Sequence, residues 1–420
     1  MSAVIGLERD AATFFADGAI NDLWSEGAPR LSLEPTVLDR STAGALAEAA
    51  VAVAMALDAA VRVAAADPVG LLGLAPDLAR IAALDAPRWL CLARADVFLT
   101  DDRHPQVCEI NSDTPTGLME CVTLGRLASR HRSDLRDPSA QLARRWAAMV
   151  RGAADVRGTA EVPGLAESDR PVVGLLDPTD ITGDLGHVRQ LTGWLEQAGC
   201  QVVRGSPFNV HGCPGGRIGL FGTPCDVLVR HYKTDWWARP DSPWCDVPPI
   251  DAPALDRELD LIAGAMAAGT VQVINPFGTA IAQNKRLMAL PFEMPERFSR
   301  VVIELVEKYL PETRFLERMD RGQLESEQNI WVLKSAYGAE GEDVVVGRQV
   351  TPMRWRQTLE RAVPYRWVAQ RAFLPRTGSD GTQANHGVFL IGGAPSGLYT
   401  RRSAGPTDHT ALSVPTLVAR

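Results

Sequence analysis

Alternation of polar and apolar residues is clearest between Leu90 and Asp113. Residues 90–99 and 106–110 have the composition of two strands, joined by the polar turn TDDRHP. Side chains two positions apart in a strand share a face, so Arg94 lies beside Asp96 and Glu109 lies beside Asn111. If the two strands pair as a hairpin, these four polar side chains converge.

The hydrophobic pattern divides the rest of the chain into three regions. Residues 1–88 are mainly helical, and the Ala-rich run 43–66 contains three charges, which favours a buried helix over a membrane span. Helices are predicted after Pro115 and over 140–152, and the polar stretch 158–170 marks a boundary. Strands then alternate with helices up to residue 274, as in an α/β unit. From residue 275, helices around 280–290, 297–309 and 353–362 accompany strands of one antiparallel sheet.

These changes predict three parts. Residues 1–165 form an N-terminal helical segment plus the hairpin, residues 166–274 form an α/β domain, and residues 275–420 form a further α+β domain. The expected fold class is mixed α+β and α/β, with a central α/β unit.

Composition narrows the possible functions. The 420 residues carry a net charge of −8 and no basic face, which excludes a typical nucleic-acid-binding protein. The seven cysteines form no C-x-x-C pair, so a disulfide framework is not expected. The N-terminus has early acidic residues and no signal-peptide pattern, which predicts a cytoplasmic protein without membrane partners. A zinc site would have to use residues whose spacing fits no common ligand pattern: His211, Cys213, Cys225, His231 and Cys245.

The hairpin offers two carboxylates and an amide, which is a set of oxygen ligands that suits Mg²⁺. Arg94 beside them could contact phosphate oxygens. On spacing alone, a solvent-facing polar strand with a surface ion pair explains the pattern equally well. A Ca²⁺ loop fits poorly, because the glycine and distal glutamate of such a loop are missing.

Two lysines stand near possible phosphate sites. Lys334 ends a predicted strand and precedes a loop with Gly338 and Gly341, which could present an ammonium group and backbone N–H groups to phosphates. Lys285 in QNKRL would by itself be read as a solvated helix lysine. The strand RWVAQRAFLP could border an adenine or belong to an ordinary core.

Several motifs in the same order resemble the synthetase domain of the glutathionylspermidine synthase family. The hairpin with R-x-D and E-x-N is followed by D-T-P-T-G-L-x-E, and HYKTDWW is similar to a substrate-side segment of that family. Later segments that resemble the family are INPFGTAIAQNKRLMALPFE, WVLKSAYGAEGEDV, YRWVAQRAFLP and GVFLIGGAPSGLYTRRS. The similarity spans roughly residues 89–403, without the family's amidase domain. Ser335 and Ala339 depart from the usual Pro and Arg of the phosphate loop.

This resemblance implies an ATP-grasp-type fold, with ATP and Mg²⁺ as cofactors and a role for each matching residue. It also implies that residues 166–274 form the substrate-side domain and residues 275–420 the nucleotide-binding domain. Asp96, Glu109 and Asn111 would ligate Mg²⁺, and Arg94 and Arg402 would act at the transferred phosphate, although the pattern does not separate Arg402 from Arg401. The residues implied in ATP binding are Lys285, Lys334, Gly338, Gly341, Gln370 and Ala372. Lys233 and Asp113 would contact substrate, Asp113 alternatively capping the helix that follows it.

The expected activity is an ATP-dependent, ADP-forming ligation of a small-molecule carboxylate to an amine through an acyl phosphate. Such phosphoryl transfer depends on positioning and charge neutralisation, so it needs no covalent nucleophile on the protein. A small-molecule kinase with the same ATP site and a non-catalytic nucleotide-binding protein remain alternatives. The sequence does not indicate the substrates or the oligomeric state.

Overall fold

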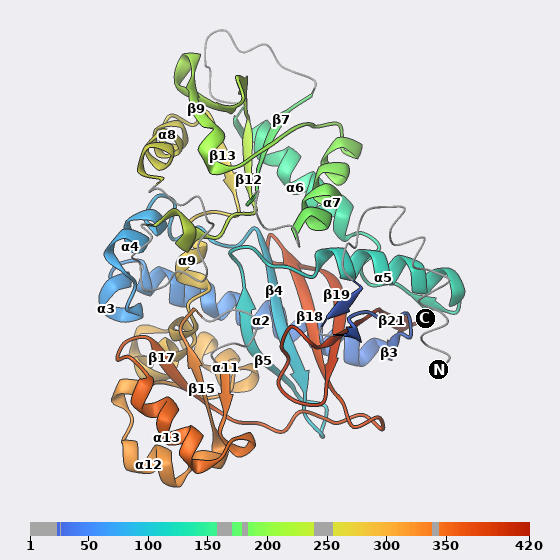
Figure 1. The fold of residues 1–420 in the computed structure, drawn as a ribbon, viewed down its shortest axis with the longest axis vertical. Helices are drawn as coiled ribbons and strands as arrows, with labels where there is room; N and C mark the ends of the chain where they lie inside the picture. The colour runs from blue at the N-terminus through green and yellow to red at the C-terminus, as the bar shows by residue number, and fades with distance from the viewer. Residues whose placement is uncertain (1–22, 26, 158–169, 179–183, 239–254, 338–343) are drawn as a thin grey trace.

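The computed structural model describes residues 23–25, 27–157, 170–178, 184–238, 255–337 and 344–420 (Figure 1). At its centre lies an antiparallel sheet in the order β20-β19-β18-β4-β5. The strands are β4 (Leu92–Leu99), β5 (Pro105–Asn111), β18 (Gln383–Ile391), β19 (Ala394–Ser403) and β20 (Leu412–Val414). The predicted hairpin is therefore confirmed, and its partner strand β18 comes from the other end of the chain.

The long helix α2 (Arg40–Ala64) packs against this sheet, contacting β4, β5, β18 and β19. The side chain of Asp39 caps it by accepting a hydrogen bond from the backbone N–H of Thr42. By length and composition α2 could cross a membrane, yet 56% of its most apolar window is buried inside the protein. The helix expected from the Ala-rich run is thus a core element of this fold.

A parallel sheet in the order β13-β12-β7-β8 forms the upper part of the molecule in Figure 1. Its strands are β7 (Val172–Leu176), β8 (Gln201–Gly205), β12 (Val227–Arg230) and β13 (Gln272–Ile274). Around it lie α6 (Leu142–Arg157), α7 (Leu185–Gln197), α8 (Asp256–Ala267) and a small antiparallel sheet of β9 (Val210–Cys213), β10 (Arg217–Leu220) and β11 (Thr223–Pro224). The predicted α/β unit is confirmed.

A third sheet, in the order β14-β17-β15-β16, lies at the bottom of Figure 1. It contains β14 (Thr313–Phe315), β15 (Trp331–Ser335), β16 (Val344–Val346) and β17 (Trp367–Arg371), with α11 (Arg300–Tyr309), α12 (Arg321–Ser326) and α13 (Pro352–Arg361) beside it. The prediction of one antiparallel sheet after residue 275 was wrong, because β18 and β19 join the hairpin instead. The domain limits 1–165, 166–274 and 275–420 stay a prediction. The central sheet combines strands from the first and the last of these segments.

Most of the remaining elements are short. The strands are β1 (Trp24–Ser25), β2 (Ala28–Pro29), β3 (Thr36–Leu38), β6 (Leu135–Arg136) and β21 (Thr416–Ala419). The helices are α3 (Pro68–Leu72), α4 (Pro76–Ala82), α5 (Leu118–His131), α9 (Thr279–Ala282) and α10 (Leu290–Glu293). The 3₁₀ turns used below are η4 (Thr234–Trp237) and η5 (Lys285–Ala289).

Two local predictions are corrected here. The segment before Asp39 contains short strands, so the first 88 residues are less helical than expected. The helix expected over 280–290 is broken into α9, η5 and α10, because the Asn284 side chain caps a new turn by accepting from the backbone N–H of Arg286. The predicted boundary at 158–170 lies almost entirely outside the described residues.

Candidate active site

The hairpin brings its four polar side chains to one place, as predicted. Arg94 pairs in register with Asn111, and Asp96 pairs with Glu109. Directly opposite residues on one face of an antiparallel pair lie within interaction distance. All four line one cavity of about 700 Å³, in which Arg94 and Asp96 are only 6% and 2% exposed. The alternative of a solvent-facing surface ion pair is therefore wrong.

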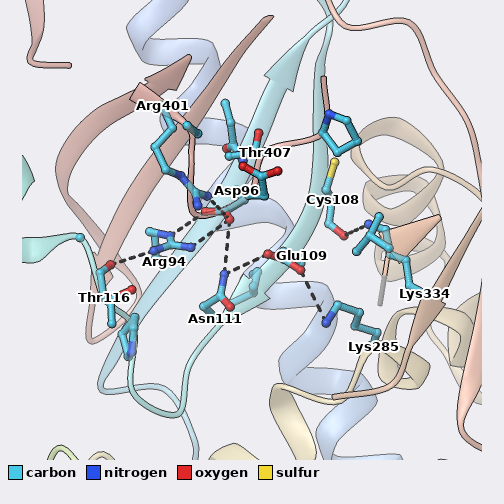
Figure 2. A pocket seen from close by; sticks show the side chains of 18 of the residues that line it. Arg94, Asp96, Cys108, Glu109, Asn111, Thr116, Lys285, Lys334, Arg401 and Thr407 are labelled. Atoms are coloured by element: carbon cyan, nitrogen blue, oxygen red, sulfur yellow. Dashed lines mark hydrogen bonds and ion pairs between the residues drawn. The ribbon is translucent and has the colours of Figure 1, made fainter. Parts of the chain in front are cut away.

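Asp96 is the most heavily engaged carboxylate of the cavity (Figure 2). Arg94 donates to both of its oxygens at 2.7 and 3.0 Å, and Arg401 donates to Oδ2 at 2.7 Å. Burial alone would raise the pKa of Asp96, but the charges of Arg94 and Arg401 outweigh it and lower the pKa to about 2. The carboxylate is therefore ionised at neutral pH.

Asn111 lies between the two carboxylates of the hairpin (Figure 2). Its Nδ2 is 3.4 Å from Asp96 Oδ2 and 3.3 Å from Glu109 Oε1. The second Glu109 oxygen is 3.8 Å from the Nζ of Lys285. Rotation of the amide by half a turn would direct its oxygen to the same point as the carboxylates, so the three side chains fit a hard divalent cation. No cluster of three or more His, Cys, Asp or Glu with metal-ligand geometry occurs among the described residues, and the suggested zinc set includes Cys245, which lies outside them.

The two predicted lysines enter the cavity from the third sheet and from η5. Lys334 is the penultimate residue of β15 and donates to the backbone carbonyl of Cys108 at 3.3 Å. The backbone N–H of Lys285 donates to the carbonyl of Ala336, which directly follows β15. Both ammonium groups are nearly buried. Apolar side chains line the cavity beside them, namely Met288, Val332, Val344, Val346 and Phe373. The loop glycines Gly338 and Gly341 lie outside the described residues.

Arg401, and not Arg402, belongs to the site. Arg401 contacts Asp96, whereas Arg402 donates to the hydroxyl of Thr36 at 2.9 Å and lies 3.8 Å from Asp380. Adjacent side chains of a strand point to opposite faces, and both residues are on β19. The assignment of Arg402 as catalytic is therefore corrected to Arg401.

Asp113 holds the fold together instead of contacting substrate. One of its oxygens accepts from the Arg230 guanidinium at 2.5 Å and from the Thr279 hydroxyl at 2.8 Å, and the other accepts from the backbone N–H of Thr234 at 2.6 Å. It also does not cap α5, whose N-cap is Gly117. The predicted substrate contact is therefore not supported by the geometry, because Asp113 is held by these partners and does not line the cavity.

The remaining predicted positions divide between the cavity and its surroundings. Gln370 lines the cavity and donates to the Thr313 hydroxyl at 3.1 Å, and Lys233 lines it beside the ring of Trp236. Ala372 does not line it, and its backbone N–H donates to the carbonyl of Ile330. The prediction for Ala372 is therefore not supported by the geometry.

Several cavity residues were missed by the sequence patterns. Arg348 follows β16 and lines the cavity near the lysines, and Arg30 pairs with Glu120 at 2.9 Å. Glu120 is the last residue of the D-T-P-T-G-L-x-E motif, so its position in the motif was the available signal. Arg30 carried no signal, because it comes from the N-terminal segment that matched no pattern.

Eight Arg or Lys and five Asp or Glu residues line the cavity, which is electropositive in a chain of net charge −8.

Comparisons with known proteins agree with these features. Residues 244–419 match the family model described as glutathionylspermidine synthase preATP-grasp. The hairpin lies outside that range, whereas the motifs of the two lysines and of Arg401 lie inside it. No curated protein sequence matches the chain significantly.

Two solved structures resemble the chain. A glutathione synthetase-like effector from Globodera pallida, in its apo form, superposes with a TM-score of 0.63 at 14% identity, covering 99% of this chain and 97% of its own. A putative gamma-glutamylcysteine synthetase from Methylobacillus flagellatus gives a TM-score of 0.44 at 12% identity, with 76% of each chain covered. The first likeness supports the ATP-grasp-type synthetase fold that the motifs predicted. The resemblance to the glutathionylspermidine synthase family is thereby confirmed for the C-terminal part of the chain, where residues 244–419 match that family's model.

Proposed function

We propose that the protein is an ATP- and Mg²⁺-dependent ligase that joins a carboxylate to an amine through an acyl phosphate. The observation that supports this function is the convergence of the hairpin residues Arg94, Asp96, Glu109 and Asn111 with Lys285, Lys334 and Arg401 around one electropositive cavity. The residues come from separate parts of the chain, which makes a chance surface cluster a poor explanation. The family match and the synthetase fold point to the same class.

The nucleotide would bind between the third sheet and the hairpin. Lys285 and Lys334 carry buried ammonium groups that would neutralise phosphate oxygens, and the apolar side chains beside them, with Gln370, would surround the base. Asp96, Glu109 and Asn111 would hold Mg²⁺, which supplies charge neutralisation on the phosphates when bound.

The two site arginines would stabilise the negative charge that develops on the transferred phosphate. During phosphoryl transfer, an oxygen of the substrate carboxylate bonds to the γ-phosphorus and the bond from phosphorus to ADP breaks. Asp96 fixes Arg94 and Arg401 before substrate arrives, so these guanidinium groups would already be in place to neutralise the developing phosphate charge. Such preorganised donors stabilise the transition state without a reorganisation cost at the moment of reaction.

The test uses hydroxylamine as a general nucleophile, because it converts an acyl phosphate to a hydroxamate whose iron(III) complex is coloured. The purified chain with ATP and Mg²⁺ is offered γ-glutamyl peptides, including glutathione and γ-glutamylcysteine, and then the common amino acids. We expect ADP and hydroxamate in equal amounts with at least one carboxylate. A stable phosphorylated product without amide would indicate a kinase, and ATP binding without any turnover would indicate a non-catalytic protein.

Replacement of Lys334 tests the nucleotide site directly. Lys334→Ala removes a buried ammonium group, so we expect ATP affinity measured by calorimetry to fall by about tenfold or more. Lys308→Ala is the matched control, because the Lys308 side chain is 55% exposed and outside the cavity. Equal ATP affinity in the two variants would contradict the proposed nucleotide site.

A further inference from the structure

A pair of histidines lines the end of the cavity that is formed by the parallel α/β unit. His187 lies on α7 and His231 directly follows β12. Their rings stack with centroids 4.4 Å apart and an interplanar angle of 27°. The Nε2 of His231 is 3.1 Å from Oδ2 of Asp184, and each histidine is only 6% exposed. We call these three residues the histidine pair and its aspartate.

This group lies where open α/β sheets bind ligands. Strands β7 and β12 are parallel neighbours, so the residues that follow their carboxyl ends meet at one edge of the sheet. His231, Lys233 and Trp236 follow β12 at that edge, and Asp184, His187 and the N-terminal turns of α5 line the same part of the cavity. The lysines of the proposed nucleotide site enter from the third sheet and from η5 instead. The cavity therefore has two ends, with the proposed nucleotide site at one and the histidine pair and its aspartate at the other. Arg94 and Asp96 lie between the elements that form these two ends.

Burial and a neighbouring charge keep His187 neutral. Burial, and then the charge of His231, lower the pKa of His187 to about 3, so His187 stays neutral at physiological pH. Asp184 faces His231, and although burial would raise its pKa, the hydrogen bond and charge of His231 lower it. The other charged groups that face the pair are Lys233 and Asp177, and Asp177 is paired with Arg204 at 3.2 Å. The group thus presents one further imidazole, that of His231, which the Asp184 carboxylate holds in place.

We propose that His231, oriented by Asp184 and packed against His187, accepts the proton that the amine substrate must lose before it attacks the acyl phosphate. This inference rests on the proposed ligase function. A primary amine arrives mostly as R–NH₃⁺, which has no lone pair for attack. The ring nitrogen of His231 that faces away from Asp184 takes one proton, and the nitrogen lone pair forms the bond to the acyl carbon. The bond from that carbon to the phosphate oxygen breaks, the phosphate leaves with the electron pair and takes the second proton, and the third stays on the amide nitrogen.

The proposal predicts that the need for His231 depends on the protonation state of the nucleophile. Hydroxylamine is a free base at neutral pH, whereas spermidine and glycine are ammonium ions there. We expect His231→Gln to lower turnover with the better of these two charged amines by about 100-fold, while hydroxylamine turnover changes by no more than about threefold. Asp184→Asn keeps the histidine but removes its carboxylate, so we expect a loss of about tenfold that is again confined to charged amines.

The experiment compares wild type, His231→Gln, Asp184→Asn and the control His131→Gln, whose residue is exposed on α5. Hydroxamate formation, ATP affinity and amide product by mass spectrometry are measured for each. In His231→Gln, the remaining turnover with the charged amine should increase with pH in proportion to the free-base fraction of that amine, whereas turnover with hydroxylamine, already a free base, should not. Three results would overturn the inference. Two of them are an equal loss of His231→Gln turnover with both kinds of nucleophile and an equal retention of turnover with both. The third is a wild type that uses hydroxylamine but neither charged amine. A wild type that forms no hydroxamate with any carboxylate would instead refute the ligase function on which the inference rests.

Discussion

Arg401 and Arg402 are neighbours in sequence, but only Arg401 is fixed by Asp96 in the cavity. We expect Arg401→Ala to lower kcat for hydroxamate formation by about 100- to 1,000-fold, because a preorganised charged donor is lost where phosphate charge develops. Arg402→Ala should leave kcat within about threefold of wild type, since its partners lie outside the cavity. Comparable losses in both variants would contradict the assignment of the site to the face of β19 that carries Arg401.

Single-residue roles were predictable from the sequence only where a pattern fixed the direction of the side chain. The i, i+2 spacing of Arg94 with Asp96 and of Glu109 with Asn111 was sufficient to predict their convergence. The run TRRS offered no such asymmetry, so strand direction and the contact with Asp96 were needed to choose Arg401. Asp113 has the same spacing as the ligands, but its partner Arg230 is 117 residues away and no local pattern reveals it.

Helix α2 joins the central sheet to α11, so its buried face should determine much of the stability of this region. Leu46 is completely buried, and Leu46→Ala should lower the free energy of unfolding by about 2–5 kcal/mol through lost burial and a residual cavity. Met55 lies on the same helix at 60% exposure, and Met55→Ala should change stability by no more than about 0.5 kcal/mol. Chemical denaturation followed by tryptophan fluorescence measures both. Similar effects of the two substitutions would contradict the packing of α2 against the sheet.

The Asp113–Arg230 ion pair connects the end of β5 to β12, η4 and α9. Burial would raise the pKa of Asp113, but Arg230 and Thr234 lower it below its usual value of 3.8. A carboxylate with a lowered pKa contributes stability above its unfolded pKa and loses that contribution as pH falls toward its folded pKa. Asp113→Asn leaves a buried guanidinium unpaired, so it should cost about 3–5 kcal/mol at pH 7.

The pH dependence provides the control for this prediction. The difference in unfolding free energy between wild type and Asp113→Asn should stay constant from pH 7 to about pH 5 and shrink below about pH 4. Asp256→Asn removes an ion pair with Arg80 that is about half exposed, and should show a difference of less than about 1 kcal/mol throughout. A difference for Asp113→Asn that does not change with pH would show that the carboxylate charge is not what stabilises the junction.

Elements with strong local periodicity were predicted, and elements defined by distant pairing were not. The hairpin and the strands and helices of the α/β unit follow from alternation and from helical spacing within short windows. The pairing of β18 with β4 brings Gly387 opposite Asp96, which no window of the sequence contains. The break in the helix over 280–290 depends on one side chain, that of Asn284, and on the backbone contact of Lys285 with Ala336. Apolar periodicity continues across that break and conceals it.

In the molecule as a whole, residues of the central sheet, the α/β unit and the third sheet line the cavity, so a bound nucleotide would connect the third sheet to the hairpin of the central sheet (Figure 1). A ligand that binds only the folded state adds RT ln(1 + [L]/Kd) to its stability, about 2.7 kcal/mol at a hundred times Kd. ATP should therefore raise the thermal midpoint of the entire chain. Mg²⁺ added with ATP should raise it further, because the metal would connect the phosphates to the hairpin.

Glu109→Gln separates the two contributions. The Glu109 side chain is 28% exposed, so its replacement should change the stability of the free protein by less than about 1 kcal/mol. The variant should keep the shift caused by ATP alone but lose most of the added shift caused by Mg²⁺, whereas the exposed control Glu307→Gln should keep both. Differential scanning fluorimetry with ATP, with Mg²⁺ and with both measures these shifts. A full Mg²⁺ increment in Glu109→Gln would remove Glu109 from the proposed metal ligands, and with it the reason for its place opposite Asp96 in the hairpin.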